Sequence, residues 1–576
     1  MAYICESCGE LVEDNEVCLC VLTMKKDKLK ARAKKYFLKK QKDSNIVNQI
    51  LKSRNIDLDY KDFIEVDFNK IYEDKYLNQD KAVKKIMEAL EKKVKIAIYG
   101  DYDADGITGT AIGLNILRGL GADTAYYIND RFTEGFGINP EGVKALHKEK
   151  VGLIITVDNG IAGIEGVNKA KELGIEVIIT DHHEPNSEIL PDCLIVDPKQ
   201  PGCPSVNKEI TGVGVLFKIL LDICQKLGKE LIAKKEMDLV ALGTVADMAP
   251  LLGENRLIVK TGLMIWNHSK GKYGIKRLIE KTGLRKDITA YELGFVFAPI
   301  LNAESRLKGR PVKGITVLTS KDTSEIDKAV DELIEINNKR KEMLEQQIQI
   351  GESLIDPDKN LFFIFDNRIT EGIAGLIASR IMDSYKTPTI VLGRTHEGYY
   401  KGSGRSIQDF NLKKALDKNS KLLKNYGGHK LACGLTVEQA NLDLVKNLLE
   451  TEGKMQLENK EAVDNVYIDS KLMTNDLNMD LMDSLNQLEP FGNGFNRPLF
   501  LIEDLRVENV TYMKDIHSKF TMNGIEFIAF NKLMEKGNKV SLVGNPQINS
   551  YNGRQSIQFV IKEILEEGTK ICELEI

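Results

Sequence analysis

Long apolar segments are missing from the sequence of 576 residues, and this absence excludes a helical membrane protein. A membrane-spanning helix needs roughly 20 consecutive apolar residues, and no run in the chain approaches that length. The first residues, Met-Ala-Tyr-Ile-Cys-Glu-Ser-Cys, also lack the charged and apolar regions of a signal peptide. A cytoplasmic protein without a membrane partner is therefore expected.

An excess of positive charge is absent as well. The net charge of −5 gives no indication of nucleic-acid binding, although a basic groove can coexist with an acidic whole. The chain is 42% hydrophobic and 29% charged, which is typical of a globular protein. Its length predicts about three or four domains.

Histidine is scarce, with seven in the chain, yet two of them are adjacent at the end of an apolar run. Three such runs, Val94–Tyr99, Val151–Val157 and Ile175–Thr180, have the length and composition of buried strands. Each follows a segment with helical periodicity, so the pattern predicts a βαβαβ unit with a parallel sheet. The carboxyl ends of parallel strands meet at one edge, and the residues expected there are Asp101, Asp103, Asp105, Asp158, His182 and His183.

Carboxylates at this density repel each other, and a hard divalent cation is the usual partner that relieves the repulsion. A solvated Asp-rich turn is the alternative for the first stretch alone. The adjacent histidines at the third strand end favour a metal site, because packing does not explain them. Asp247 lies just before Pro250, which ends its element, and it is the natural last carboxylate of the set.

Four of the nine cysteines fall within the first 20 residues, at Cys5, Cys8, Cys18 and Cys20. A glycine follows the first pair, as in the tight knuckles that bind zinc. A disulfide is not expected in a reducing compartment. The spacing therefore predicts a small structural zinc site, and a tail with unrelated cysteines is the alternative.

Residues 25–54 are strongly basic, with Asp27 and Asp43 as the only acidic residues. Tyr36, Phe37 and Leu38 interrupt the run. One interpretation is the solvated face of a helix. The other is electrostatic attachment to a nucleic acid or an acidic partner.

The second half of the chain begins with a long segment without proline, residues 312–356. Residues 324–354 read as one charged helix that connects two domains. A second α/β unit follows, and it contains two glycine-rich stretches, 401–406 and 426–429. Glycines let a backbone approach a phosphate, although ordinary turns have the same composition.

The chain is rich in β-type sequence from about residue 460 to its end. The dipeptide Asn552-Gly553 predicts a hairpin. The pattern is typical of a small barrel of the OB type, a frequent single-strand-binding module in which bases stack on exposed aromatic side chains. The aromatic candidates for stacking are Tyr512, Phe520, Phe527 and Tyr551.

The ordered set of motifs resembles the DHH phosphoesterase superfamily and, within it, the RecJ family. The resemblance covers residues 70–565 and leaves out the cysteine-rich and basic N-terminus. Two departures are Ser305, where a glycine is usual, and Thr370, where a histidine is common. The matching motifs are Gly100-Asp101-Tyr102-Asp103-Ala104-Asp105-Gly106, Asp158-Asn159-Gly160, Asp181-His182-His183, Gly243–Asp247, Asn302-Ala303 with Arg306-Leu307, Gly402–Ser406, Gly427-Gly428-His429 and Pro490–Gly494.

The resemblance implies an α/β protein with a parallel-sheet DHH domain and a C-terminal OB-type barrel. The expected parts are a zinc knuckle (1–24), a basic segment (25–58), the DHH domain (59–320), a connector helix (321–356), a smaller DHH-associated α/β domain (357–455) and the OB-type domain (460–576).

The implied activity is hydrolysis of single-stranded DNA from the 5′ end to mononucleotides, in repair, recombination or replication. The family implies two divalent cations, Mn²⁺ or Mg²⁺, with Asp158 between them and His183 on the scissile phosphate. A monomer that cooperates with a single-strand-binding protein or a helicase is expected. The remaining metal ligands are Asp101, Asp103, Asp105, His182 and Asp247, and the substrate-binding residues are Arg131, Arg306, Ser403, Arg405 and His429.

Two other functions fit parts of this pattern. A nano-RNase or cyclic-dinucleotide phosphodiesterase of the same superfamily shares the first two domains but has little need of a barrel or of the Pro490–Gly494 segment. A non-catalytic replication scaffold typically loses metal carboxylates, and here all are present.

Overall fold

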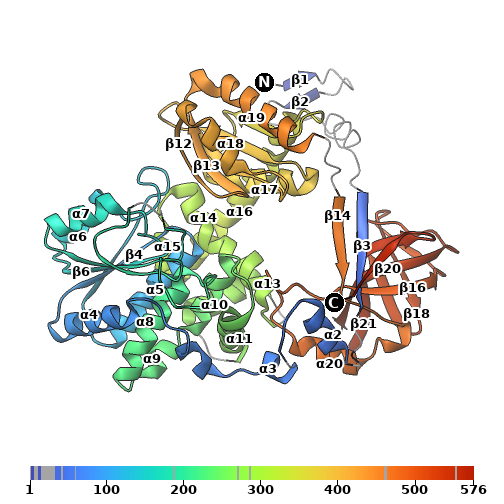
Figure 1. Ribbon diagram of the computed structural model, residues 1–576, viewed down its shortest axis with the longest axis horizontal. Helices are drawn as coiled ribbons and strands as arrows, with labels where there is room; N and C mark the ends of the chain where they lie inside the picture. The colour runs from blue at the N-terminus through green and yellow to red at the C-terminus, as the bar shows by residue number, and fades with distance from the viewer. Residues whose placement is uncertain are drawn as a thin grey trace.

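The computed structural model of the chain forms two α/β domains and a β-rich C-terminal domain (Figure 1). Within its described part, no helix combines the length and apolarity that crossing a membrane requires. The described residues are 2–4, 11–13, 33–40, 43, 45–58, 60–185, 189–268, 272–284, 287–458, 463–551 and 554–575. The four N-terminal cysteines lie outside these ranges, so the zinc site stays a prediction.

Five parallel strands form the sheet of the first α/β domain. The predicted first, second and third strands are confirmed as β4, β6 and β7, and two more strands extend the sheet at its edges. The two edge strands escaped prediction because one is only partly buried and the other has three residues. In order across the sheet the strands are β5 (Thr124–Ile128), β4 (Ile96–Gly100), β6 (Leu153–Val157), β7 (Glu176–Thr180) and β8 (Leu194–Val196).

Helices cover both faces of this sheet, as the apolar strands require. Ile96 and Ile98 of β4 pack in one core with residues of α5 and α8, and Ala97 and Tyr99 pack in the other with residues of α6 and α7. The helices of this domain are α4 (Gln79–Glu91), α5 (Ala104–Gly119), α6 (Pro140–Lys148), α7 (Ile164–Glu172), α8 (Gly212–Lys226), α9 (Glu230–Lys234), α10 (Met237–Ala246), α11 (Gly253–His268), α12 (Tyr273–Thr282), α13 (Ala290–Glu292), α14 (Ala298–Lys308) and α15 (Val312–Thr319).

The predicted connector helix is confirmed as α16 (Thr323–Ser353), which packs against α14 and α15 of the first domain and α17 of the second. The second α/β domain has a mixed five-stranded sheet. Its strands, in order, are β12 (Leu423–Gly428), β13 (Ala432–Val437), β11 (Tyr400–Arg405), β10 (Thr389–Arg394) and β9 (Phe362–Asp366), and its helices are α17 (Glu371–Tyr385), α18 (Leu412–Lys418) and α19 (Leu442–Leu457).

Both glycine-rich stretches lie mostly in strands, β11 and β12, and not in loops. Gly402 is central in β11, where a Cβ atom would come 2.0 Å from the Val391 carbonyl oxygen of the neighbouring strand. The glycines therefore allow close strand packing, and the side chains of Ser403 and Arg405 lie on the face of the sheet that packs against α17.

The C-terminal domain is built on a seven-stranded sheet with α20 (Met479–Gln487) beside it. The predicted hairpin is confirmed, because β20 and β21 pair with Tyr551 opposite Arg554. Residues His517–Met522 and Ile525–Ala529 form a second hairpin. The strands in order are β15 (Ser470–Lys471), β16 (Phe500–Arg506), β20 (Lys539–Tyr551), β21 (Arg554–Glu566), β19 (Ile525–Ala529), β18 (His517–Met522) and β17 (Thr511–Met513).

The described part of the basic N-terminal segment belongs to this C-terminal domain. Residues Ala33–Lys40 form strand β3, which lies between β14 (Val463–Ile468) and β22 (Ile571–Glu575) and runs parallel to both. The helical-face interpretation of these residues is therefore wrong. Helix α2 (Ile46–Ser53) follows and buries Val47, Ile50 and Leu51 in the core of the same domain.

Candidate active site

The three aspartates after β4 are held by the sharp turn into α5. Asp103 caps this helix, because its carboxylate accepts hydrogen bonds from the backbone amides of Asp105 (3.0 Å) and Gly106 (3.2 Å). Only glycine fits at position 106, since a Cβ atom there would lie 2.4 Å from the Asp101 carbonyl oxygen. The close turn places the side chains of Asp101 and Asp105 in the buried interior of the site.

The N-terminus of α8 orients Asp105. The two carboxylate oxygens of Asp105 accept hydrogen bonds from the backbone amides of Gly212 (2.7 Å) and Val213 (3.0 Å). These amides are the free donors at a helix start, where the helix dipole also favours a negative charge. Sequence analysis did not identify this support, because it joins residues far apart in the chain.

Asp158 lies on a strained turn at the end of β6. Its φ of 61° is in the left-handed region, which is uncommon for residues other than glycine. Gly212 approaches so closely that a Cβ atom there would lie 2.5 Å from the Asp158 Cβ. The Asn159 side-chain amide donates to the carbonyl oxygens of Tyr99 (3.0 Å) and Val157 (2.9 Å) and thereby fixes the turn.

Asp181, the first residue of the triplet after β7, positions both histidines. Its carboxylate accepts hydrogen bonds from the backbone amides of Ile161 (2.9 Å) and His182 (2.8 Å), and it contacts Nδ1 of His183 at 2.7 Å. Nε2 of His182 lies 3.0 Å from Oδ1 of Asp158 and 3.7 Å from Oδ2 of Asp247. Asp181 escaped prediction as a site residue, although its place at a strand end was the available signal.

The seven predicted metal and catalytic residues come together at the carboxyl edge of the sheet. Their donor atoms form three groups, in each of which all atoms lie within 4.8 Å of one another. Asp158 belongs to two of these groups, and His182 also belongs to two. The groups are Asp101, Asp103 and Asp158; Asp158, His182 and His183; and Asp105, His182 and Asp247.

This donor set fits divalent cations. Oδ1 of Asp101 is buried and has no hydrogen-bond partner among the described residues, which is costly for a carboxylate unless a cation binds it. Burial, followed by repulsion from neighbouring carboxylates, raises the pKa values of Asp101, Asp105 and Asp158 well above the usual range. The same causes raise the pKa of Asp247 to about 7. A bound cation would relieve this repulsion.

The two histidines differ in charge. Burial and the neighbouring His183 lower the pKa of His182 to about 3, so its imidazole is neutral, as a metal ligand must be. Burial also opposes a charge on His183, but the hydrogen bond to Asp181 and its negative charge outweigh burial and raise the pKa of His183 to about 9. His183 is therefore an imidazolium that suits contact with a phosphate.

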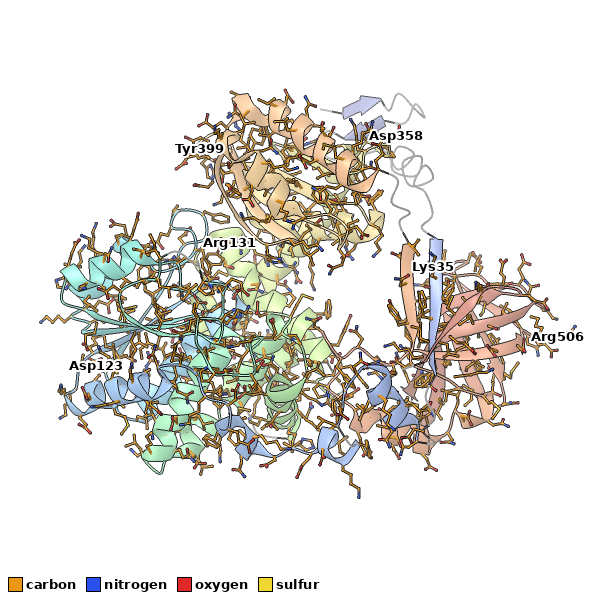
Figure 2. All side chains as sticks on the ribbon, viewed as in Figure 1. Lys35, Asp123, Arg131, Asp358, Tyr399 and Arg506 are labelled. Atoms are coloured by element: carbon orange, nitrogen blue, oxygen red, sulfur yellow. The ribbon has the colours of Figure 1, made fainter. Side chains whose placement is uncertain are left out.

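A group of arginines lies where the two α/β domains meet. Arg306 of α14 is half-buried, and desolvation, followed by the charges of Arg131 and Arg340, lowers its pKa to about 9. The positive charge of Arg405 on β11 also acts on the guanidinium of Arg306. Arg131 stacks over the Tyr102 ring at 4.9 Å, and Figure 2 shows it at the border between the two domains. Such an excess of partly buried positive charge suits an anion.

Arg340 was not predicted. Its guanidinium is buried on α16 and donates to Oδ1 of Asn337 at 2.9 Å. Both residues occur at helical spacing from the buried Leu333, so polar residues at core positions of the connector helix were the available signal.

The other predicted substrate-binding residues have different surroundings. The Ser403 hydroxyl donates to the Cys433 carbonyl oxygen at 3.0 Å and accepts from the Arg405 guanidinium, so it joins the arginine group. His429 is exposed just beyond β12, where its backbone amide donates to the Ala432 carbonyl oxygen at 2.8 Å.

Two of the aromatic candidates for base stacking are wrong. Phe520 is 2% exposed and Phe527 is fully buried, because both rings pack in the core of the C-terminal domain. Tyr512 is 50% exposed and remains available. The side chain of Tyr551 lies outside the described part of the structure.

Three family models match the chain along the same order of domains. The DHH family, N-terminal domain, matches residues 95–244, the DHHA1 domain matches 358–453 and the RecJ OB domain matches 468–563. The first model includes six of the seven residues at the carboxyl edge of the sheet, and Asp247 follows just after its end.

Similar proteins agree with these matches. The single-stranded-DNA-specific exonuclease RecJ of Bacillus subtilis is 34% identical over 529 residues, which cover 88% of this chain and 66% of that protein. RecJ of Escherichia coli is 31% identical over 520 residues, which cover 84% of this chain and 90% of that protein. The crystal structure of Thermus thermophilus RecJ in complex with Mn²⁺ has a TM-score of 0.80 at 29% identity, covering 92% of this chain and 77% of that one. The chain therefore belongs to the RecJ family of single-stranded-DNA-specific exonucleases.

Proposed function

We propose that the chain removes mononucleotides from the 5′ end of single-stranded DNA, using the carboxylate and histidine cluster at the edge of the first sheet. The observation that supports this proposal most strongly is that the carboxylate of Asp158 belongs to two groups of metal-binding atoms. Shared ligands are what two neighbouring cations require, and Asp158 is the residue that would bridge them.

The cations would be held by Asp101, Asp103, Asp105, Asp158, His182 and Asp247. When bound, two divalent cations supply an activated water and stabilise the oxygen that leaves the phosphate. Relatives crystallised with Mn²⁺ and with Mg²⁺ support both metals as cofactors.

The protein residues around the cations bind and orient the substrate. His183, held as an imidazolium by Asp181, would donate a hydrogen bond to an oxygen of the scissile phosphate. Arg306 and Arg405 come from different domains and would hold neighbouring phosphates, with Arg131 and Arg340 beside them. Because these arginines come from different domains, they would hold the DNA strand across the border between the domains. The reacting phosphate would then face the carboxylate and histidine cluster in one orientation.

Three finer features belong to the same proposal. Cys5, Cys8, Cys18 and Cys20 would hold a structural zinc ion. The C-terminal sheet would close as an OB-type barrel that retains the single strand. The protein would act as a cytoplasmic monomer beside a single-strand-binding protein or helicase.

The direction of degradation is tested with two single strands of identical sequence, one labelled at the 5′ end and one at the 3′ end. In Mn²⁺, the 5′-labelled strand should release labelled mononucleotide at once, and the 3′-labelled strand should shorten progressively. EDTA should stop both reactions. Immediate release of the 3′ label, or a preference for dinucleotides over long strands, would contradict the proposal.

A further inference from the structure

The three-stranded sheet β14-β3-β22 has one buried and one open face. Tyr36 and Leu38 of β3 are 8% exposed and pack against Leu501, Val543 and Leu565. Successive side chains of a strand point to opposite faces, so Lys35, Phe37 and Lys39 lie on the other face. Tyr467 of β14 is directly opposite Phe37 and shares this outer face.

The centre of the outer face is a pair of stacked rings. The ring centroids of Phe37 and Tyr467 are 5.4 Å apart, with 24° between the ring planes. Tyr467 is 49% exposed, which is unusual for an aromatic residue in the middle of a strand. An exposed ring supported from behind by a second ring is a rigid surface on which a nucleic-acid base can stack.

Lysines surround the rings. Nζ of Lys39 lies 5.5 Å from the centre of the Tyr467 ring and donates to the Ser53 carbonyl oxygen, so it is held beside the ring. Lys35 is exposed. Lys34, on the opposite face, is bound to Glu563 at 2.8 Å and therefore contributes no charge to the outer face. Rings interleaved with lysines match the alternation of bases and phosphates in a single strand.

The position of the sheet suits a path from the active site. β14 follows α19 of the second α/β domain along the chain, and β3 and β14 stand on the side of the C-terminal domain turned toward the other two domains (Figure 1). Lys35 is labelled at this side in Figure 2. β3 lies outside residues 468–563, the range that matches the RecJ OB domain, and β14 reaches this range only at Ile468.

We infer that Lys35, Phe37, Lys39 and Tyr467, here called the β3–β14 platform, bind single-stranded DNA beyond the active site by stacking a base on Tyr467 and contacting phosphates with the lysines. This inference rests on the proposed function, because the ligand is the distal part of the strand being degraded. Its consequence is a preference for strands long enough to reach from the metal cluster to the platform.

The test compares kcat and KM of the full chain in Mn²⁺ on an oligonucleotide of about 5 nucleotides and on one of about 30. The first length is near the lower limit of the span of typical single-strand-binding modules, and the second is above that span. Replacing Tyr467 by Ala should raise KM for the long strand by about 5- to 100-fold, the worth of one stacked base, and leave kcat and both constants for the short strand unchanged. Tyr467→Phe should behave like the wild type. Tyr467→Leu, which preserves apolar volume, should behave like Tyr467→Ala, and it serves if the alanine variant does not fold.

The contribution of the lysine charges is tested by the salt dependence of DNA binding. Binding of the long strand is measured by fluorescence anisotropy in EDTA. Lys35→Ala should reduce the slope of log affinity against log salt by roughly 0.7, the value for one phosphate contact on a single strand. Lys84→Ala is the matched control, because Lys84 is also exposed but lies on α4 of the first domain.

The outcomes separate the platform from the proposed function. A wild type that degrades no single strand would overturn the proposed function. Normal degradation with equal KM for the wild type and both nonaromatic Tyr467 variants would overturn the platform. A third outcome is that a poly-glutamate peptide competes with DNA only when Lys35 is present, while DNA binding does not change when Tyr467 is replaced. This outcome would assign the face to an acidic protein partner instead.

Discussion

The side-chain amide of Asn493, in the segment that leads into the C-terminal domain, donates a hydrogen bond to the carbonyl oxygen of Met248, the residue after Asp247. The carbonyl oxygen of Asn493 in turn accepts from the backbone amide of Leu251 at 2.8 Å. Met248 has a φ of 58°, so the loop after Asp247 is strained and depends on these contacts. The C-terminal domain thus supports the loop that carries Asp247, a carboxylate of the proposed metal site.

Replacing Asn493 by Ala should therefore weaken metal binding. Residues that orient a ligand typically change metal affinity by about 10- to 100-fold when they are replaced, and the lower end is expected because Asp247 is one ligand of several. Isothermal titration with Mn²⁺ measures the change. Asn419→Ala is the control, since the Asn419 side chain also donates to a backbone carbonyl, at 2.8 Å, but lies in the second α/β domain. Equal Mn²⁺ affinities for the wild type and both variants would exclude this role of Asn493.

Deleting residues 461–576 should destabilise the first α/β domain as well as remove DNA-binding surface. Arg256 of α11 is buried, stacks over Phe63 at 4.1 Å and donates to the carbonyl oxygens of Leu488 (2.7 Å) and Pro490 (3.1 Å). The deletion removes these acceptors, and a hydrogen bond from a charged group contributes about 1.5–3 kcal/mol to stability. Calorimetry should show a lower melting temperature for the remaining domains; an unchanged transition would show that the contacts contribute nothing.

Asp181→Asn should reduce kcat more than it changes KM. The substitution leaves the volume unchanged but removes the charge that holds His183 as an imidazolium. A loss of about 10- to 100-fold in kcat is expected for a supporting residue of this kind. Steady-state degradation of a single strand measures both constants, and circular dichroism checks the fold. A variant with wild-type kcat would show that His183 needs no support from Asp181.

The zinc prediction concerns residues outside the described structure. Replacing Cys5 and Cys8 by Ser in the full chain should remove a bound zinc ion without changing exonuclease activity, because the remaining two cysteines cannot complete a tetrahedral site. Elemental analysis of the purified wild type and variant measures the metal. Zinc-free wild type would indicate that the cysteines have another role.

The metal cluster could be predicted from the sequence because its information is local. The end of a buried strand can be recognised from the sequence where the apolar run stops. The residues that follow Gly100, Val157 and Thr180 must therefore meet at one sheet edge. The connector helix was equally predictable, since its periodicity continues without a proline from Thr323 to Ser353.

The missed features depend on contacts between distant parts of the chain. Nothing near Tyr36 indicates that β3 pairs with β14 and β22, so the basic run read as a helix or a free segment. The residues around Gly402 do not alternate between apolar and polar side chains, so the sequence does not indicate a strand. In the fold, this strand packs closely on Val391. The sequence around Phe527 has the same pattern as the sequence around an exposed aromatic residue. Only the folded domain shows that the ring of Phe527 is buried.

The central claim is that the cluster around Asp158 performs the hydrolysis, and Asp158→Asn tests it most directly. Asparagine is among the residues that tolerate a φ of 61°, so the fold should persist, whereas the carboxylate shared by two groups of metal-binding atoms is lost. The measurement is the rate of single-strand degradation in Mn²⁺ by wild type and variant, with circular dichroism as the control for folding. The account predicts that the rate falls by roughly 10³-fold or more while the fold is retained. A folded variant that degrades single strands at close to the wild-type rate would contradict it.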